Sequence, residues 1–247
     1  MPRPYSLPLS AAVAVLSATV SHAQAPAPQP RAVVELFTSQ GCSSCPPADK
    51  LMGEFARDPS LVAMSLPIDY WDYLGWKDTL ADHAFTARQK GYGEQRGDRQ
   101  VYTPQAVIDG VSHAIGSNSQ AVEAAEPTAK AKGAMSVAVS AETVGGKIRV
   151  SLGAGKPGAQ AGVYLVPIRK RCDVEITRGE NKGKSVTYVN VARGLVPVGA
   201  WNGEARVFEV AASLAQQRES DSYVVLLQTG TPERPGVILG AAKGPGL

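Results

Sequence analysis

The chain has few cysteines and few histidines, with three of each among its 247 residues. Three cysteines are too few for the network of disulfides that stabilises small secreted scaffolds, so the fold must depend on buried apolar cores. The three histidines show no spacing that compels a metal site, which needs several converging ligands. We therefore expect no bound metal ion and no organic cofactor.

A strong excess of charge and the common nucleotide-binding motifs are also missing. The formal net charge is +3, which does not suggest nucleic-acid binding in a chain of this length. There is no Walker loop, and the glycines at residues 91–93 lack the third glycine of a dinucleotide fingerprint. We therefore expect neither nucleic acid nor a nucleotide as a partner.

The first 23 residues have the pattern of a signal peptide. Arg3 gives a basic start, residues 7–20 are apolar, and small residues suited to cleavage surround Ala23. The apolar run is short for a membrane span, which needs about 20 residues, and an uncleaved anchor is the alternative. We predict a signal peptide over residues 1–23 and a Pro/Ala linker over residues 24–31. The protein is then secreted, in the periplasm, without stable membrane insertion after cleavage.

Cys42 and Cys45 form the most informative motif, a Cys-x-x-Cys pair between an apolar run and a helix-like segment. This position is typical of thiol–disulfide chemistry, because the positive end of the helix dipole favours the thiolate. We predict a disulfide in which Cys42 is the attacking sulfur and Cys45 the resolving one. The alternative is an inert structural disulfide. Pro46 and Pro47 suggest that the helix begins near Cys45, which weakens the effect of the dipole on Cys42.

The chain after residue 31 shows two patterns. Residues 32–133 alternate between apolar strands and amphipathic helices in the order β-α-β-α-β-β-α. Residues 134–247 show short segments of strict alternation separated by glycine-rich turns, which favours an antiparallel sandwich. We predict an α/β N-terminal domain over residues 32–133 and an all-β, sandwich-like C-terminal domain over residues 134–247. The expected helices of the first domain cover residues 46–56, 76–89 and 121–132.

Thr103 and Pro104 form the second motif, directly before the third expected strand. The order of elements around Cys42, Cys45 and this Thr-Pro resembles the thioredoxin superfamily. The resemblance implies a thioredoxin-like N-terminal domain in which Pro104 is cis and faces the cysteines. It also implies that Thr103 offers backbone groups to a bound substrate chain. The alternative is an ordinary trans proline at the start of a strand.

Longer stretches of the chain resemble one family of exported proteins, DUF1223. They are residues 33–49, 102–105, 178–181 and 201–203. The family implies a thioredoxin-like domain fused to a β-rich domain, without an established substrate or reaction. Thioredoxins bury an acid under the disulfide, and Glu35 is the candidate for proton transfer by that resemblance. A peripheral carboxylate is the alternative reading of Glu35.

An aromatic and acidic segment follows the second expected strand. Residues 69–78 hold four aromatic and three acidic side chains, in a chain that is only 6% aromatic. Loops that leave the carboxyl ends of strands line the ligand crevice of α/β sheets. We therefore predict that Asp69, Trp71 and Trp76 bind substrate beside Cys42. The alternative is aromatic packing that covers the sheet and anchors the next helix.

Together these features predict an exported thiol–disulfide oxidoreductase that uses Cys42 and Cys45. Its partners would be protein or small-molecule thiols and disulfides, and a redox protein that recycles it. One alternative is a copper or zinc carrier that uses the two thiolates. Another is a non-catalytic binding or assembly module in which the disulfide is structural. Cys172 is either a reserve thiol or a packing residue, as free cysteines usually are.

Overall fold

The computed structural model describes Met1 and residues 29–247. The expected signal peptide and most of the expected linker lie outside these residues. Within the described part of the chain, no helix is long and apolar enough to cross a membrane. The elements are β1 (Ala32–Thr38), α1 (Pro46–Phe55), β2 (Leu61–Pro67), η1 (Asp72–Leu74), α2 (His83–Arg96), β3 (Gln105–Ile108), β4 (Ser112–Ile115), α3 (Ser119–Ala131), β5 (Val139–Val144), β6 (Lys147–Leu152), β7 (Ala161–Glu175), β8 (Ser185–Ala192), β9 (Val196–Trp201), β10 (Arg206–Ala211), η2 (Ala212–Glu219), β11 (Ser222–Gly230) and β12 (Pro235–Lys243).

The first half of the chain follows the element order predicted for residues 32–133. Strand β1 pairs in parallel with β2 and antiparallel with β3, which in turn pairs with β4. Side chains of β1 alternate between the two faces of the sheet. Val34 and Leu36 pack with α1 on one face, whereas Val33 and Phe37 pack with α2 on the other. Because both faces are covered by helices, all seven residues of β1 are buried.

Helix α2 begins seven residues later than the predicted helix at residues 76–89. Asp82 caps it by accepting a hydrogen bond from the backbone nitrogen of Ala84, at 2.9 Å. Before it, the Asp78 carboxylate accepts bonds from the backbone nitrogens of Leu80 and Ala81. These side-chain bonds hold residues 78–81 in a turn, since an aspartate that satisfies backbone donors competes with helix formation.

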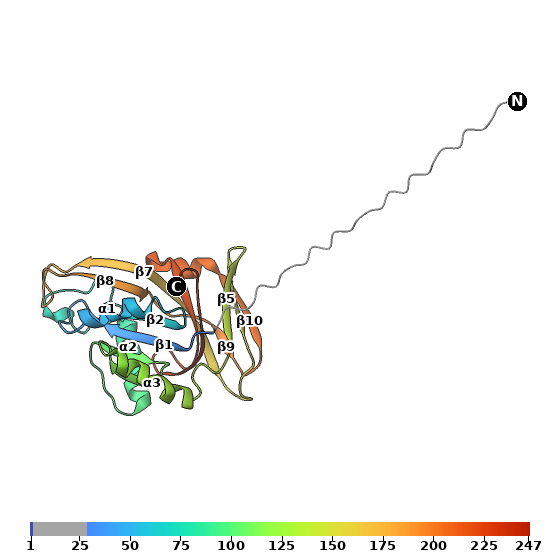
Figure 1. The fold of residues 1–247 in the computed structure, drawn as a ribbon, viewed down its shortest axis with the longest axis horizontal. Coiled ribbons are helices and arrows are strands. Elements are labelled where there is room, and N and C mark those ends of the chain that lie inside the picture. Colours follow the sequence, from blue (N-terminus) through green and yellow to red (C-terminus); the bar gives the residue numbers. More distant parts are fainter. Residues whose placement is uncertain (2–28) are drawn as a thin grey trace.

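The predicted fold of two separate domains is wrong. Strand β8 of the second half pairs in parallel with β2 of the first half, where Ser65 faces Val191. The result is one mixed, nine-stranded sheet in the order β12-β11-β7-β8-β2-β1-β3-β4, with β9 also paired to β7. The protein is thus a sheet-dominated fold around one large sheet, not an α/β thioredoxin-like domain followed by a β-sandwich (Figure 1).

A smaller sheet of three strands, in the order β10-β6-β5, completes the second half. Its apolar residues, among them Ile148 and Val150, pack with Val163 and Leu165 of β7 and with Trp201. This core is separate from the cores on the two faces of β1. The small sheet therefore covers one face of the large sheet at β7, β11 and β12, the part that lies away from β1.

A buried polar network also connects the two halves. Glu35 of β1 forms an ion pair with Arg88 of α2, with 2.8 Å between Oε1 and Nε. Arg88 also donates to Gln228 of β11 at 2.7 Å, and Tyr92 donates to Glu35. Each of these four side chains is at most 1% exposed. A buried charge needs such partners, so the network fixes the position of β11 relative to β1 and α2.

Candidate functional site

Cys42 and Cys45 are joined in a disulfide at the start of α1. Cys45 is the residue that caps the helix, and Pro46 and Pro47 occupy its first two positions. Cys42 therefore lies in the preceding turn, as the two prolines suggested. Cys42 is 4% exposed and Cys45 is fully buried, whereas Ser43 and Ser44 between them are exposed.

The peptide bond between Thr103 and Pro104 is cis, which confirms that prediction. A Cβ placed on Gly116 would lie 3.4 Å from the Cβ of Pro104 and 3.4 Å from the Cβ of Ala48. Pro104 is therefore a close neighbour of the first turn of α1, the turn that begins at Cys45. Pro104 thus lies beside the helix that begins at Cys45, although about 60 residues separate the two segments in sequence.

Trp71 connects these two segments. Its indole nitrogen donates a hydrogen bond to the hydroxyl of Thr103 at 2.8 Å. Its Cβ lies 3.1 Å from the position that a Cβ on Gly41 would occupy, so Trp71 packs closely against the residue directly before Cys42. Tyr73 stacks on Trp71 with ring centroids 6.2 Å apart, and it is 76% exposed. An open aromatic surface therefore lies beside the disulfide.

Trp76 and Asp69, the other predicted members of this loop, have different positions. The indole of Trp76 donates to the side-chain oxygen of Gln40 at 2.8 Å, two residues before Cys42. Asp69 accepts a bond from Thr86 at 2.6 Å and pairs with His83 at 2.8 Å. Trp76 thus supports the cysteine loop, whereas Asp69 anchors the first turns of α2.

Asn181, in the loop between β7 and β8, reaches the cysteine segment from the second half of the chain. Its side-chain nitrogen donates to the backbone oxygens of Gln40 and Cys42, at 2.9 and 2.8 Å. The side-chain oxygen of Asn181 accepts a bond from Lys184, and the residue is 1% exposed. Sequence reasoning did not identify Asn181 as a site residue. Its position in a polar, glycine-containing loop gave no sign that it would be buried.

Glu35 and Asp49 are the two buried acids nearest to the motif in sequence. Glu35 points to the α2 face of the sheet, where Arg88 neutralises it, and α1 lies on the opposite face. Asp49 lies one turn after Cys45 on α1, and residues four apart share a helix face. Its Oδ1 accepts a bond from Thr38 at 2.7 Å, whereas its buried Oδ2 has no partner.

The environment of Asp49 favours its protonated form. Burial, and to a smaller extent the nearby Asp78, raise the pKa of this carboxyl to about 8, although the hydrogen bond from Thr38 acts in the opposite direction. Burial likewise raises the pKa of Asp78 to about 6. Asp78 is held in place because it accepts the backbone N–H of Gln40 at 2.8 Å. Two buried carboxyls thus lie close to the cysteine loop, and Asp49 was missed although its spacing from Cys45 is a readable signal.

Cys172 is the one free cysteine among the described residues. It lies on β7 opposite Tyr188 of β8, in a small apolar cluster with Leu80. It is 3% exposed, and burial raises the pKa of its thiol. Packing is therefore the role that the structure supports for Cys172. Across residues 29–247, no group of three or more His, Cys, Asp or Glu side chains is placed to hold a metal ion.

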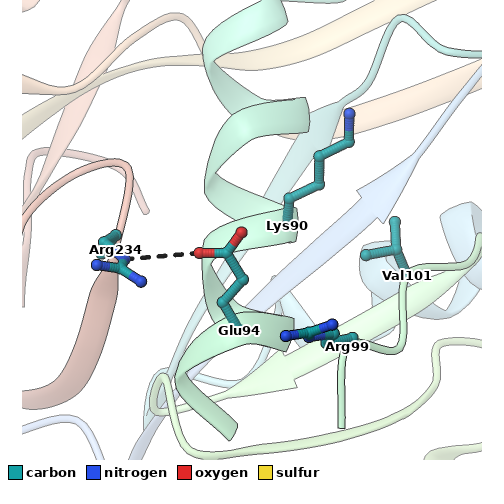
Figure 2. A pocket seen from close by; sticks show the side chains of 5 residues that line it. All are labelled: Lys90, Glu94, Arg99, Val101 and Arg234. Carbon is teal, nitrogen blue, oxygen red and sulfur yellow. Dashed lines mark ion pairs between the residues drawn. The ribbon is translucent and has the colours of Figure 1, made fainter. Parts of the chain in front are cut away.

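An open, charged pocket of about 500 Å³ lies between the second half of α2 and the β11–β12 turn (Figure 2). Arg234 pairs there with Glu94, at 3.5 Å between Nε and Oε2. Lys90, Arg99 and Val101 complete its lining, and the four charged side chains are exposed. The pocket contains neither cysteine and none of the aromatic residues of the loop at residues 69–78. It is therefore not part of the cysteine site.

The comparisons with known proteins concern the fold and the family. The crystal structure of protein AGR_C_4864 from Agrobacterium tumefaciens is similar, at 33% identity and a TM-score of 0.79 over 89% of this chain and 96% of that one. HBP35 of Porphyromonas gingivalis has a similar fold, at 10% identity and a TM-score of 0.55 over 87% of this chain and 74% of that one. No curated protein matches this sequence. Residues 33–228 match the model of the family described as "Protein of unknown function (DUF1223)", and the chain belongs to this family.

Proposed function

We propose that the protein carries out thiol–disulfide exchange through Cys42 and Cys45. The observation that carries the proposal is the position of Pro104, which lies near Ala48 in the first turn of α1, the helix that begins at the Cys42–Cys45 disulfide. This arrangement resembles the site of the thioredoxin superfamily, in which that proline faces the cysteines. Export, proposed from the sequence of residues 1–23, would place the pair in a compartment where disulfides persist.

The exchange has two steps that balance without a cofactor. A thiolate of a substrate dithiol attacks Cys42 Sγ, the Cys42–Cys45 bond breaks, and the electron pair stays on Cys45. The second thiolate of the substrate then attacks the mixed disulfide, which releases Cys42 and leaves the substrate oxidised. The protein gains two electrons and two protons. A recycling partner that carries a disulfide restores the oxidised pair by the reverse steps.

Asp49 is suited to supply the proton that Cys45 takes up. It lies on the same helix one turn beyond Cys45, it is 2% exposed, and its free Oδ2 has no other partner. A pKa of about 8 keeps the carboxyl protonated at neutral pH and close to the ordinary pKa of a thiol. In this proposal Asp49 has the role that the sequence assigned to Glu35.

Substrate would lie against Thr103 and the aromatic surface of Trp71 and Tyr73. Thr103 is fixed by its bond from Trp71, and the exposed ring of Tyr73 can cover an apolar side chain of a polypeptide. Polypeptide thiols or disulfides are therefore the substrate class that this surface favours over small thiols.

The test is a redox titration of the Cys42–Cys45 pair against defined dithiol and disulfide buffers, read by mass after alkylation. Oxidoreductase pairs have midpoints between about −120 and −270 mV. A midpoint in this range, with Cys42 alkylated faster than Cys45, supports exchange. The low exposure of both cysteines favours a second candidate, a binding module with a structural disulfide. A midpoint below about −300 mV would select that candidate.

A further inference from the structure

Cys42 is buried although its neighbours in sequence are exposed. Ser43 and Ser44 are exposed, while Cys42 is 4% exposed. A thiolate must approach Cys42 Sγ along the line of the S–S bond, so this degree of burial leaves little room for attack. Some neighbouring segment must therefore move before exchange can occur.

The loop between β7 and β8, residues 176–184, contacts the backbone of Cys42 through Asn181, and we name it the hairpin cover. Strands β7 and β8 form a long hairpin that runs beside α1 (Figure 1). The ends of the hairpin cover are closed by backbone bonds from Ile176 to Lys184 and from Gly183 to Ile176, at 2.9 and 2.7 Å. It is thus a closed loop that can move as a unit at its two strand ends.

Two contacts hold the hairpin cover on the cysteine loop. Asn181 donates both of its side-chain bonds to backbone oxygens of that loop, one of them the oxygen of Cys42 itself. Gly179, with a φ of +74°, lies so close to Trp76 that an added Cβ would be 3.0 Å from the Trp76 Cβ. The remaining charged side chains of the cover, Arg178, Glu180 and Lys182, are not buried. Besides Asn181, only Ile176 of the cover is buried, in the apolar cluster with Leu80 and Tyr188. Few groups therefore hold the cover in place, which suits a contact that must break and re-form.

We infer that the hairpin cover gates the redox pair and that Asn181 is the positioning residue that holds it closed. The inference rests on the proposed function, and it adds to that function a role for the second half of the chain. The cover lifts to admit a substrate thiol to Cys42, and Asn181 re-forms its two bonds when the substrate leaves. The large sheet supports this role because β8, which carries the cover, is paired with β2.

The experiment measures how fast dithiothreitol reduces the Cys42–Cys45 disulfide in the oxidised protein, by quenched alkylation and mass. Asn181→Ala should raise this rate about tenfold, because it removes both bonds that favour the closed cover. Gly179→Ala should also raise the reduction rate, because an alanine at this φ of +74° is strained and its Cβ would press against Trp76. In the wild type, the rate should become independent of dithiothreitol at high concentration, where opening of the cover is limiting.

Asn190→Ala is the matched control. Asn190 is 8% exposed and its side chain donates to the backbone oxygen of Ala63 at 3.0 Å, away from the cysteines. The backbone at Asn190 has a φ of +47°, where an alanine is strained. This variant should therefore lose at least as much global stability as Asn181→Ala. Its reduction rate should nevertheless stay within about twofold of the wild type, since the cover keeps its attachments.

The outcomes separate the gate from the proposed function. Equal rates for the wild type and Asn181→Ala, or equal acceleration by Asn190→Ala, would overturn the gate whatever the redox midpoint is. A wild-type rate that rises in proportion to dithiothreitol at every concentration would overturn it without any variant. A redox midpoint below about −300 mV would instead rule out the proposed function, and the reduction rates of the variants would still test the gate.

Discussion

Asp49→Asn tests whether the carboxyl beside the cysteines is protonated in the folded protein. The unfolded carboxyl has a pKa near 3.8, and burial raises it to about 8 in the fold. Between these values the folded state binds one proton more than the unfolded state. The free energy of unfolding therefore falls as pH rises, by about 1.4 kcal/mol per pH unit. Below pH 4 both states are protonated and this loss is absent.

This fall in the free energy of unfolding with pH is large enough to measure by urea unfolding of the oxidised protein. From pH 5 to pH 7, the wild type should lose about 3 kcal/mol relative to Asp49→Asn. The amide of asparagine leaves a donor unpaired where Oδ2 lies, which costs about 1–3 kcal/mol, but this cost does not change with pH. Comparing how the free energy of unfolding changes with pH in the two proteins, rather than its value at one pH, removes this constant cost. Asp78 also titrates in this range, and its contribution is nearly equal in the two proteins because Asp49 is protonated and uncharged from pH 5 to pH 7.

Parallel pH profiles for the wild type and Asp49→Asn would refute the reasoning. They would mean that Asp49 is ionised in the fold, so that it has no proton to give to Cys45. Thr38→Val is a useful companion, since it removes the hydroxyl that donates to Asp49 Oδ1. The carboxylate form should then be stabilised less, and the slope of the profile should extend to higher pH.

Three further predictions concern other residues. Glu35→Gln leaves the charge of buried Arg88 without its partner and should lower the free energy of unfolding by about 3–5 kcal/mol, measured in urea, while the redox midpoint stays unchanged. A shifted midpoint with intact stability would instead place Glu35 in the chemistry. Tyr73→Ala should leave stability within about 0.5 kcal/mol, because the ring is exposed, and should lower kcat/KM for a reduced polypeptide but not for dithiothreitol. Equal effects on both substrates would contradict a substrate surface at Tyr73. Cys172→Ser should keep the midpoint of the Cys42–Cys45 pair, and a shift would show that the buried thiol takes part in exchange.

The parts of the fold that sequence predicted are those encoded locally. The strand, Cys-x-x-Cys and helix at residues 32–56 follow from a run of apolar residues, a helix start and two prolines. The cis bond at Pro104 was accessible because the family resemblance pointed to it, and the position of Trp71 near the cysteine loop because it follows the second strand. The strand and helix needed only neighbouring residues, whereas the cis bond needed the resemblance.

The features that sequence did not predict depend on pairings between distant segments. The alternating pattern of β8 is compatible with many neighbours, and nothing in it identifies β2 as the partner. Asn181 has the composition of a solvated turn, and only the approach of the cysteine loop buries it. Trp76 was expected in a helix because its spacing to later apolar residues is helical, but the Asp78 side chain forms a turn there. Tertiary contacts decided each of these cases.

The pairing of β8 with β2 also sets an order of events during synthesis. Contacts between these strands join residues about 124 positions apart, such as the bond from the Ser65 hydroxyl to the oxygen of Val189. Such distant pairings form slowly, and they cannot form before the later strand has been made. The two cysteines are therefore synthesised well before Asn181. In the proposed gate, the nascent chain has its Cys42–Cys45 pair before the hairpin cover exists, and the cover can close only once β8 has been made.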